Sequence, residues 1–212
     1  MPLYKSIAVA ENTQVHIWKI TESLDMLYQS VGLKDVCLAR FEGMKSEQHK
    51  KGFLSVRMLL QHIGYTDFDL YYSQDGKPHL NDGRNISITH SYGFSAIIVS
   101  DADSGIDMEM RREKVIKIAD KFIDREFDYL DDADTTEYVR KLIVIWGVKE
   151  SLYKMFSRNG LSFRENIYVV PFKMEKGTGT AAVHFEDIDA KCSYHFEEIE
   201  DFTLVYCTNP KG

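Results

Sequence analysis

The chain has few cysteines, few prolines and no long apolar run, and each shortage excludes a class of protein. Its 212 residues include 3 cysteines and 4 prolines. An odd cysteine count without metal-ligand spacing argues against both a disulfide-stapled secreted domain and a zinc module. We therefore expect a reducing, cytoplasmic compartment, in which all of the cysteines are core thiols: Cys37, Cys192 and Cys207.

Membrane and nucleic-acid partners are not expected either. The longest apolar stretch, residues 142–148, is far below the ~20 residues that a membrane-spanning helix needs. No N-terminal apolar signal is expected, because Lys5, Glu11 and His16 interrupt the first 19 residues. The net charge is −7, whereas a general nucleic-acid surface is basic.

Hydrophobic periodicity predicts a mixed helix and strand protein with a normal core. In residues 47–62 the apolar side chains recur at helical spacing, and Gly64 supplies a stop. A weak internal repeat is also present, since a helix that ends in glycine precedes a group of strands twice, at 54–100 and at 150–207. We expect helices at 21–33, 47–62, 114–122 and 136–156, and strands at 5–10, 13–20, 69–72, 85–88, 95–100, 166–174, 181–185, 193–198 and 203–208.

Two short acidic patterns predict a site for a hard cation. Asp107 and Glu109 alternate along an expected strand end, so both side chains lie on one face. Glu150 and Lys154 are one turn apart on an expected helix. Carboxylates from two elements suit Mg²⁺, which completes its shell with waters and substrate phosphates, and Mn²⁺ is the alternative ion.

Ordinary explanations exist for each pattern taken alone. An Asp-x-Glu pair is usually a solvated strand edge, and Glu150 with Lys154 could be an exposed ion pair worth about 0.3–0.5 kcal/mol. The helix around Glu150 is otherwise apolar, however, from Leu142 to Phe156. Charges within such a helix need partners, because an unpaired buried charge is costly. This favours a lined site.

Four segments together resemble one family, the Sfp-type 4′-phosphopantetheinyl transferases of the holo-acyl-carrier-protein synthase superfamily. The family signature is Gly-Ile/Val-Asp-x-Glu, followed after about 40 residues by Trp/Phe-x-x-Lys-Glu-Ala/Ser-x-x-Lys. The matching segments are residues 105–109, 146–154, 75–78 (Asp-Gly-Lys-Pro) and 88–91 (Ile-Thr-His-Ser). Gly147 departs from the usual Ser, Cys or Thr, and we interpret it as a point of close packing.

The resemblance implies a fold, a reaction and partners. The fold is α/β (α+β), with two similar subdomains related by a pseudo-twofold axis, 1–102 and 103–212, and the active site in the cleft between them. The reaction moves 4′-phosphopantetheine from coenzyme A to a serine of an acyl or peptidyl carrier protein and releases 3′,5′-ADP. A monomer is expected. The pathway stays open among fatty acid, polyketide, nonribosomal peptide and lysine synthesis.

The resemblance also implies roles for the acidic and basic residues. Asp107, Glu109 and Glu150 would hold the metal. Either Glu150 or a water positioned by Asp107 and the metal would take the serine proton, and the two alternatives stay open. Lys154 would contact coenzyme A and stabilise the leaving 3′,5′-ADP. Lys149 is a weaker candidate, because its side chain leaves the helix in a different direction from that of Glu150.

Further residues of the first half are expected to bind coenzyme A. Lys77 lies in a turn that Pro78 stiffens, and three hydrogen-bonding side chains follow one another at a strand end. Arg57 could contact the 3′-phosphate or the adenine, and a structural ion pair is an equally good alternative. The expected coenzyme A contacts are Arg57, Lys77, Pro78, Thr89, His90, Ser91 and Lys154.

A basic cluster follows the first acidic pattern. Carrier proteins are generally acidic, so Arg111, Arg112, Lys114 and Lys117 are candidates for carrier docking. Two other functions compete with the transferase. One is a different Mg²⁺-dependent phosphoryl-transfer enzyme, although the chain has no P-loop. The other is a non-catalytic module that binds coenzyme A or the carrier, although all three carboxylates and Lys154 are present.

Overall fold

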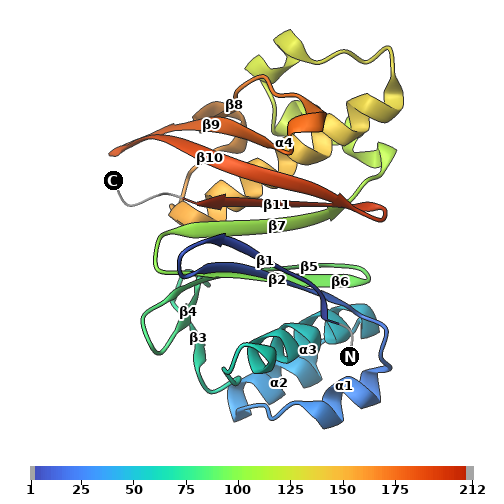
Figure 1. The fold of residues 1–212 in the computed structure, drawn as a ribbon, viewed down its shortest axis with the longest axis vertical. Helices are drawn as coiled ribbons and strands as arrows, with labels where there is room; N and C mark the ends of the chain where they lie inside the picture. Colours follow the sequence, from blue (N-terminus) through green and yellow to red (C-terminus); the bar gives the residue numbers. More distant parts are fainter. Residues whose placement is uncertain (1–2, 209–212) are drawn as a thin grey trace. The chain divides into compact units, whose positions relative to one another are not determined.

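The computed structural model describes residues 3–208, and the chain divides into two compact units between Asp101 and Ala102. Each unit is built of helices and one antiparallel sheet, so the protein is α+β (Figure 1). All helices of the described residues are too short or too polar to span a membrane.

The first unit consists of a six-stranded sheet and three α-helices. One face of the sheet packs against α3, the longest helix of this unit, through a core that includes Trp18, Leu59 and Ile97. The elements in chain order are β1 (Leu3–Ala10), β2 (Thr13–Lys19), α1 (Leu24–Ser30), α2 (Asp35–Gly43), α3 (Glu47–His62), β3 (Leu70–Tyr72), β4 (Pro78–Leu80), β5 (Asn85–Ser91) and β6 (Phe94–Ser100).

The second unit consists of a five-stranded sheet and one long helix, α4, which packs against β7 and β11. Its core includes Leu142, Val148 and Val205. The elements are β7 (Ser104–Met110), the 3₁₀ helices η1 (Glu113–Lys121) and η2 (Arg125–Tyr129), α4 (Thr135–Phe156), α5 (Phe163–Asn166), β8 (Ile167–Val169), η3 (Met174–Lys176), β9 (Thr178–Phe185), β10 (Ile188–Ile199) and β11 (Phe202–Thr208).

The two sheets have corresponding strand orders. The first runs β1-β2-β6-β5-β4-β3 and the second runs β7-β11-β10-β9-β8. Apart from the additional edge strand β1, each unit contains one strand, then a helical region with one long helix, then four strands. The five strands pair in corresponding order in the two sheets. The two segments of the weak sequence repeat, 54–100 and 150–207, lie within α3 to β6 and within α4 to β11.

The two long helices match the sequence-based expectations, whereas several other elements differ from them. Strands β9 and β10 are longer than expected, and β8 ends at Val169 rather than at residue 174. Helix α3 has the expected bounds, is capped by Ser46 and is followed by Gly64 at a φ of 88°. The helix expected at 21–33 is shorter, because Ser23 caps it at Leu24. Helix α2 and strand β4 were not expected, and the helix expected at 114–122 is the 3₁₀ helix η1.

All three cysteines are buried and free, as expected for core thiols: Cys37, Cys192 and Cys207.

Candidate functional site

Strand β7 presents two acidic side chains toward helix α4. Asp107 and Glu109 lie on the same face of the strand as Gly105, and Met108 lies on the opposite face. At Gly105 an added Cβ would lie 1.8 Å from the backbone oxygen of Ser151, in α4. A residue with a side chain would therefore force the strand and the helix apart. The glycine at the head of the acidic pattern lets both carboxylates come close to α4.

Helix α4 presents the other two candidate residues on the turns that face β7. Glu150 and Lys154 lie one turn apart and are half-buried. One turn earlier, an added Cβ at Gly147 would lie 2.6 Å from Val205 Cγ2 and 3.8 Å from Asp107 Oδ2. The expected close packing at Gly147 is confirmed, and it brings the helix onto β7 and β11 beside the carboxylates.

An ion pair joins the strand to the helix. Lys154 Nζ donates to Asp107 Oδ1 at 2.8 Å and to the backbone oxygen of Ile106 at 3.0 Å. The Asp107 side chain is 5% exposed and that of Lys154 is 29% exposed, so the pair lies at the edge of the buried region. The structure thus brings together two predicted site residues that are 47 positions apart in the sequence.

The other two carboxylates share this electrostatic environment. Burial raises the pKa of Glu109 to about 7, and repulsion by Asp107 adds to the effect, while Lys154 opposes it. Burial and repulsion by Asp107 also raise the pKa of Glu150, again opposed by Lys154. The Trp146 indole N–H donates a hydrogen bond to Glu109 and favours its charged form. Acidic charge is therefore concentrated around a single ammonium group.

The donor set fits a hard divalent cation. Asp107, Glu109 and Glu150 offer only oxygen ligands, the type that Mg²⁺ prefers. Because repulsion by Asp107 raises the pKa of both Glu109 and Glu150, a cation among these side chains would be stabilised. In residues 3–208 no three Asp, Glu, His or Cys side chains are drawn together closely enough to hold an ion, and Lys154 is the cation that contacts Asp107.

Lys149 has a structural position rather than a place beside Glu150. It is fully buried and lies 2.7 Å from Glu126 Oε1. Its ammonium also donates to the backbone oxygens of Phe122 and Phe163, at 2.7 and 2.9 Å. Glu126 in turn accepts from the backbone N–H of Val169 at 3.0 Å. This buried pair fastens η2 and β8 to α4.

Arg57 forms a structural ion pair with Asp67, one of the two alternatives that the sequence left open beside a contact with coenzyme A. Its side chain is 2% exposed and lies 3.0 Å from Asp67 Oδ1. The guanidinium also donates to the backbone oxygen of Phe53 and stacks on the ring of that residue at 3.5 Å. These contacts hold Arg57 in a structural role within the first unit.

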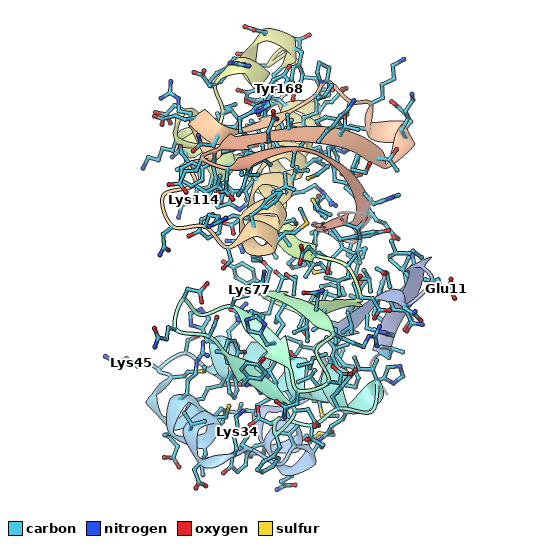
Figure 2. All side chains as sticks on the ribbon, turned by 90° about the vertical axis from the view of Figure 1, so that its left-hand side faces the viewer. Glu11, Lys34, Lys45, Lys77, Lys114 and Tyr168 are labelled. Atoms are coloured by element: carbon cyan, nitrogen blue, oxygen red, sulfur yellow. The ribbon has the colours of Figure 1, made fainter. Side chains whose placement is uncertain are left out.

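Lys77 lies in the turn between β3 and β4, as expected. The turn is closed by the Ser73 N–H, which donates to the Lys77 oxygen at 3.0 Å, and by Gly76 at a φ of 84°. Pro78 begins β4 directly after it. The Lys77 side chain is half-buried and is labelled in Figure 2.

The three polar residues at the end of β5 do not share a face. Alternation puts His90 on the side of α3, where its ring lies against Gly52: an added Cβ there would be 2.9 Å from His90 Nδ1. Thr89 and Ser91 point to the opposite face, where both are buried. The three residues thus lie at one strand end, as expected, but consecutive side chains point to opposite faces of the sheet.

The basic cluster after β7 has two parts. Arg111 donates to the backbone oxygens of Glu200 and Phe202 and is 3.6 Å from Glu198, so it braces the β10–β11 turn. The exposed part consists of Arg112, Lys114 and Lys117, with Ile116 exposed among them; Figure 2 labels Lys114.

This fold and site define an α+β domain in which an ion pair between Asp107 and Lys154 joins one strand to one helix, with two further glutamates in the same electrostatic environment. Residues 104–207 match the family model of the 4′-phosphopantetheinyl transferase superfamily. The C-terminal half of the chain is therefore a domain of this superfamily, and it carries the whole of the strand and helix site. No curated protein matches the chain.

Proposed function

We propose that the protein transfers the 4′-phosphopantetheine group of coenzyme A to a serine of an acyl or peptidyl carrier protein, as Sfp-type enzymes do. The observation that carries the proposal is the ion pair between Lys154 and Asp107, with Glu109 and Glu150 in the same electrostatic environment, inside a domain of the matching superfamily. The corresponding strand orders support a further proposal, that the two units are pseudo-symmetric copies of one fold.

The proposed reaction is a displacement at phosphorus. The carrier serine oxygen attacks the phosphorus that bears the pantetheine arm, and the bond to the bridging pyrophosphate oxygen breaks to release 3′,5′-ADP. Asp107, Glu109 and Glu150 would hold Mg²⁺, which neutralises charge on the phosphate oxygens. Glu150, whose pKa is raised by burial, is suited to accept the serine proton. Lys154 supplies a positive charge to the leaving group.

Mass spectrometry of an apo carrier protein tests the proposal. After incubation with this protein, coenzyme A and Mg²⁺, the carrier serine should gain a phosphopantetheine group, and 3′,5′-ADP should appear in equal amount. The matched control omits Mg²⁺ and includes EDTA. Release of inorganic phosphate with an unmodified carrier would favour the other Mg²⁺-dependent phosphoryl enzyme. Coenzyme A binding without any product would indicate a binding module.

We propose that Lys77 and His90 bind phosphate groups of coenzyme A, with Pro78, Thr89 and Ser91 shaping this part of the first unit and Arg57 supporting it through its ion pair. Lys77→Ala and His90→Ala should each weaken coenzyme A binding by about 10-fold, the value of a lost charge-assisted hydrogen bond. The single-turnover rate at saturating coenzyme A should change little, because such contacts stabilise ground and transition states alike.

Isothermal titration with coenzyme A measures the first effect and rapid quench the second. Arg84→Ala is the matched control. Arg84 is a basic residue that directly precedes the first residue of β5, whereas His90 lies near the last, and Arg84 pairs with Asp101 at 3.3 Å. Unchanged affinity in the Lys77 and His90 variants would remove both residues from the coenzyme A site.

We also propose that Arg112, Lys114 and Lys117 dock the carrier, while Arg111 supports the fold. Reversing the three exposed charges to Glu should raise the KM for an acidic carrier about 10-fold at low salt and flatten its salt dependence. The KM for coenzyme A should stay the same. The protein carries a net charge of −7, so this local patch offsets repulsion of the carrier.

The control for docking is a second triple reversal, at Lys173, Lys176 and Lys191, which are also exposed and also in the second unit. This control changes the net charge by the same amount but leaves the proposed docking patch intact. It should therefore affect the carrier KM much less. An equal effect of both triple variants would show that net charge, rather than a docking patch, governs the carrier KM.

A further inference from the structure

The ammonium group of Lys154 lies where the acidic side chains need a cation. It contacts Asp107 Oδ1 at 2.8 Å, and its charge opposes the rise in pKa that burial and Asp107 cause at both Glu109 and Glu150. A single lysine thus interacts with all three carboxylates that we assign to the metal. The nearby backbone oxygen of Ile106, at 3.0 Å, holds the ammonium in this position.

A divalent cation and Lys154 would compete for the same oxygen. Inner-sphere Mg²⁺ lies about 2.1 Å from a ligand oxygen. An ammonium that donates to that oxygen at 2.8 Å occupies the direction from which an ion approaches. Two positive groups this close would also repel each other strongly in a half-buried setting. Both cannot bind Asp107 Oδ1 in the present geometry.

We propose that Lys154 takes the place of the divalent cation at Asp107 in the free protein, and that cation binding releases the lysine. This inference rests on the proposed function, because it uses the metal ligands assigned there. The exchange gives Lys154 two states. In the first it neutralises the acidic site and joins β7 to α4, and in the second its ammonium is available to a phosphate group. Cation binding would therefore make the lysine ammonium available, in addition to neutralising charge on the phosphate oxygens.

Two features of Lys154 make the exchange physically reasonable. Its side chain is 29% exposed, so the released ammonium can move into water without a large desolvation cost. Its long flexible stem can change rotamer while the helix backbone stays in place. By contrast, the ammonium of Lys149 is fully buried and bonded to Glu126 and two carbonyl groups, so it is not free to move in this way.

Amine labelling tests the release directly. A brief pulse of an acylating reagent, read by peptide mass spectrometry, reports how available each lysine amine is. We expect saturating Mg²⁺ or Mn²⁺ to increase labelling of Lys154 about 2–5-fold, as expected for the loss of a partly exposed ion pair. Lys141 is the matched control on the same helix, since it pairs with Glu137 at 2.7 Å and is 19% exposed. Its labelling should not change.

Metal affinity gives a second readout that needs neither coenzyme A nor a carrier. Lys154→Gln removes the competing charge and should bind Mn²⁺ about 2–10-fold more tightly than the wild type. Lys154→Arg keeps the charge and should bind as weakly as the wild type. Lys141→Gln removes a charge from the same helix without removing a competitor and should have no effect.

The outcomes separate this inference from the proposed function. Unchanged labelling of Lys154 at saturating cation overturns the exchange even if the protein modifies a carrier. Equal Mn²⁺ affinity of the wild type and Lys154→Gln overturns it as well, including the case in which neither protein binds the ion. If cation-dependent labelling is found but no carrier is modified, the exchange stands and the transferase proposal fails.

Discussion

Replacing Glu150 by glutamine should lower phosphopantetheine transfer by about 100-fold or more while leaving the protein folded. The change keeps the size of the side chain and removes one anionic ligand from the metal set. A metal that polarises phosphate oxygens lowers the activation free energy by several kcal/mol, and each 1.36 kcal/mol is a tenfold change in rate. Glu150 is also one of the two proposed proton acceptors, beside a water positioned by Asp107 and the metal, and glutamine cannot take that role. Single-turnover formation of the modified carrier measures the effect.

The same loss is expected for Asp107→Asn and Glu109→Gln, each with weaker Mn²⁺ binding. Glu137→Gln is the matched control, because Glu137 is an exposed glutamate of the same helix and pairs with Lys141. It should retain wild-type turnover. Full activity of any site variant in EDTA, with no metal restored, contradicts the assignment of the three carboxylates.

Breaking the buried pair between Lys149 and Glu126 should lower the free energy of unfolding by about 3–5 kcal/mol, because the remaining charge is buried without its partner. The two side chains are 0% and 1% exposed, and they connect α4 to η2 and β8. Lys149→Met and Glu126→Gln should both have this effect, measured by urea unfolding of the full chain.

The double variant, Lys149→Met with Glu126→Gln, should be less destabilised than the sum of the single variants, since no charge is then left unpaired. The amide oxygen introduced at position 126 can still accept from the Val169 N–H. Lys141→Met breaks an exposed pair of the same helix and should cost less than about 1 kcal/mol. Single-variant losses as small as this would show that the buried pair does not hold the second unit together.

Sequence patterns identified the elements whose signals are local. Helix α3 could be bounded because its apolar residues repeat at helical spacing and Gly64 follows it. The acidic positions in β7 could be assigned to one face because strand side chains alternate. The close packing at Gly147 was also predictable, since a glycine inside a long apolar helix usually has a packing reason.

Features that depend on distant partners could not be read from the sequence. Glu126 lies among other acidic residues in a turn-rich stretch, and nothing local shows that it is buried against Lys149. The only signal was a lysine in an otherwise apolar helix, which required a counter-charge from somewhere. The sequence grouped Arg111 with its exposed basic neighbours because they are adjacent. Its hydrogen-bond partners in the β10–β11 turn are about 90 positions away, so no local pattern reveals them.

The corresponding strand orders have a consequence for stoichiometry. Strand β6 and strand β11 both begin at a phenylalanine, and their registers against β2 and β7 place His16 and Trp18 of the first unit where the second has Asp107 and Glu109. The second unit therefore carries the acidic pair, and the first has an imidazole and an indole at the corresponding two positions. On the proposal that the two units are copies of one fold and that the acidic residues hold the metal, the chain should bind one cation, not two, and titration should end at a molar ratio near one.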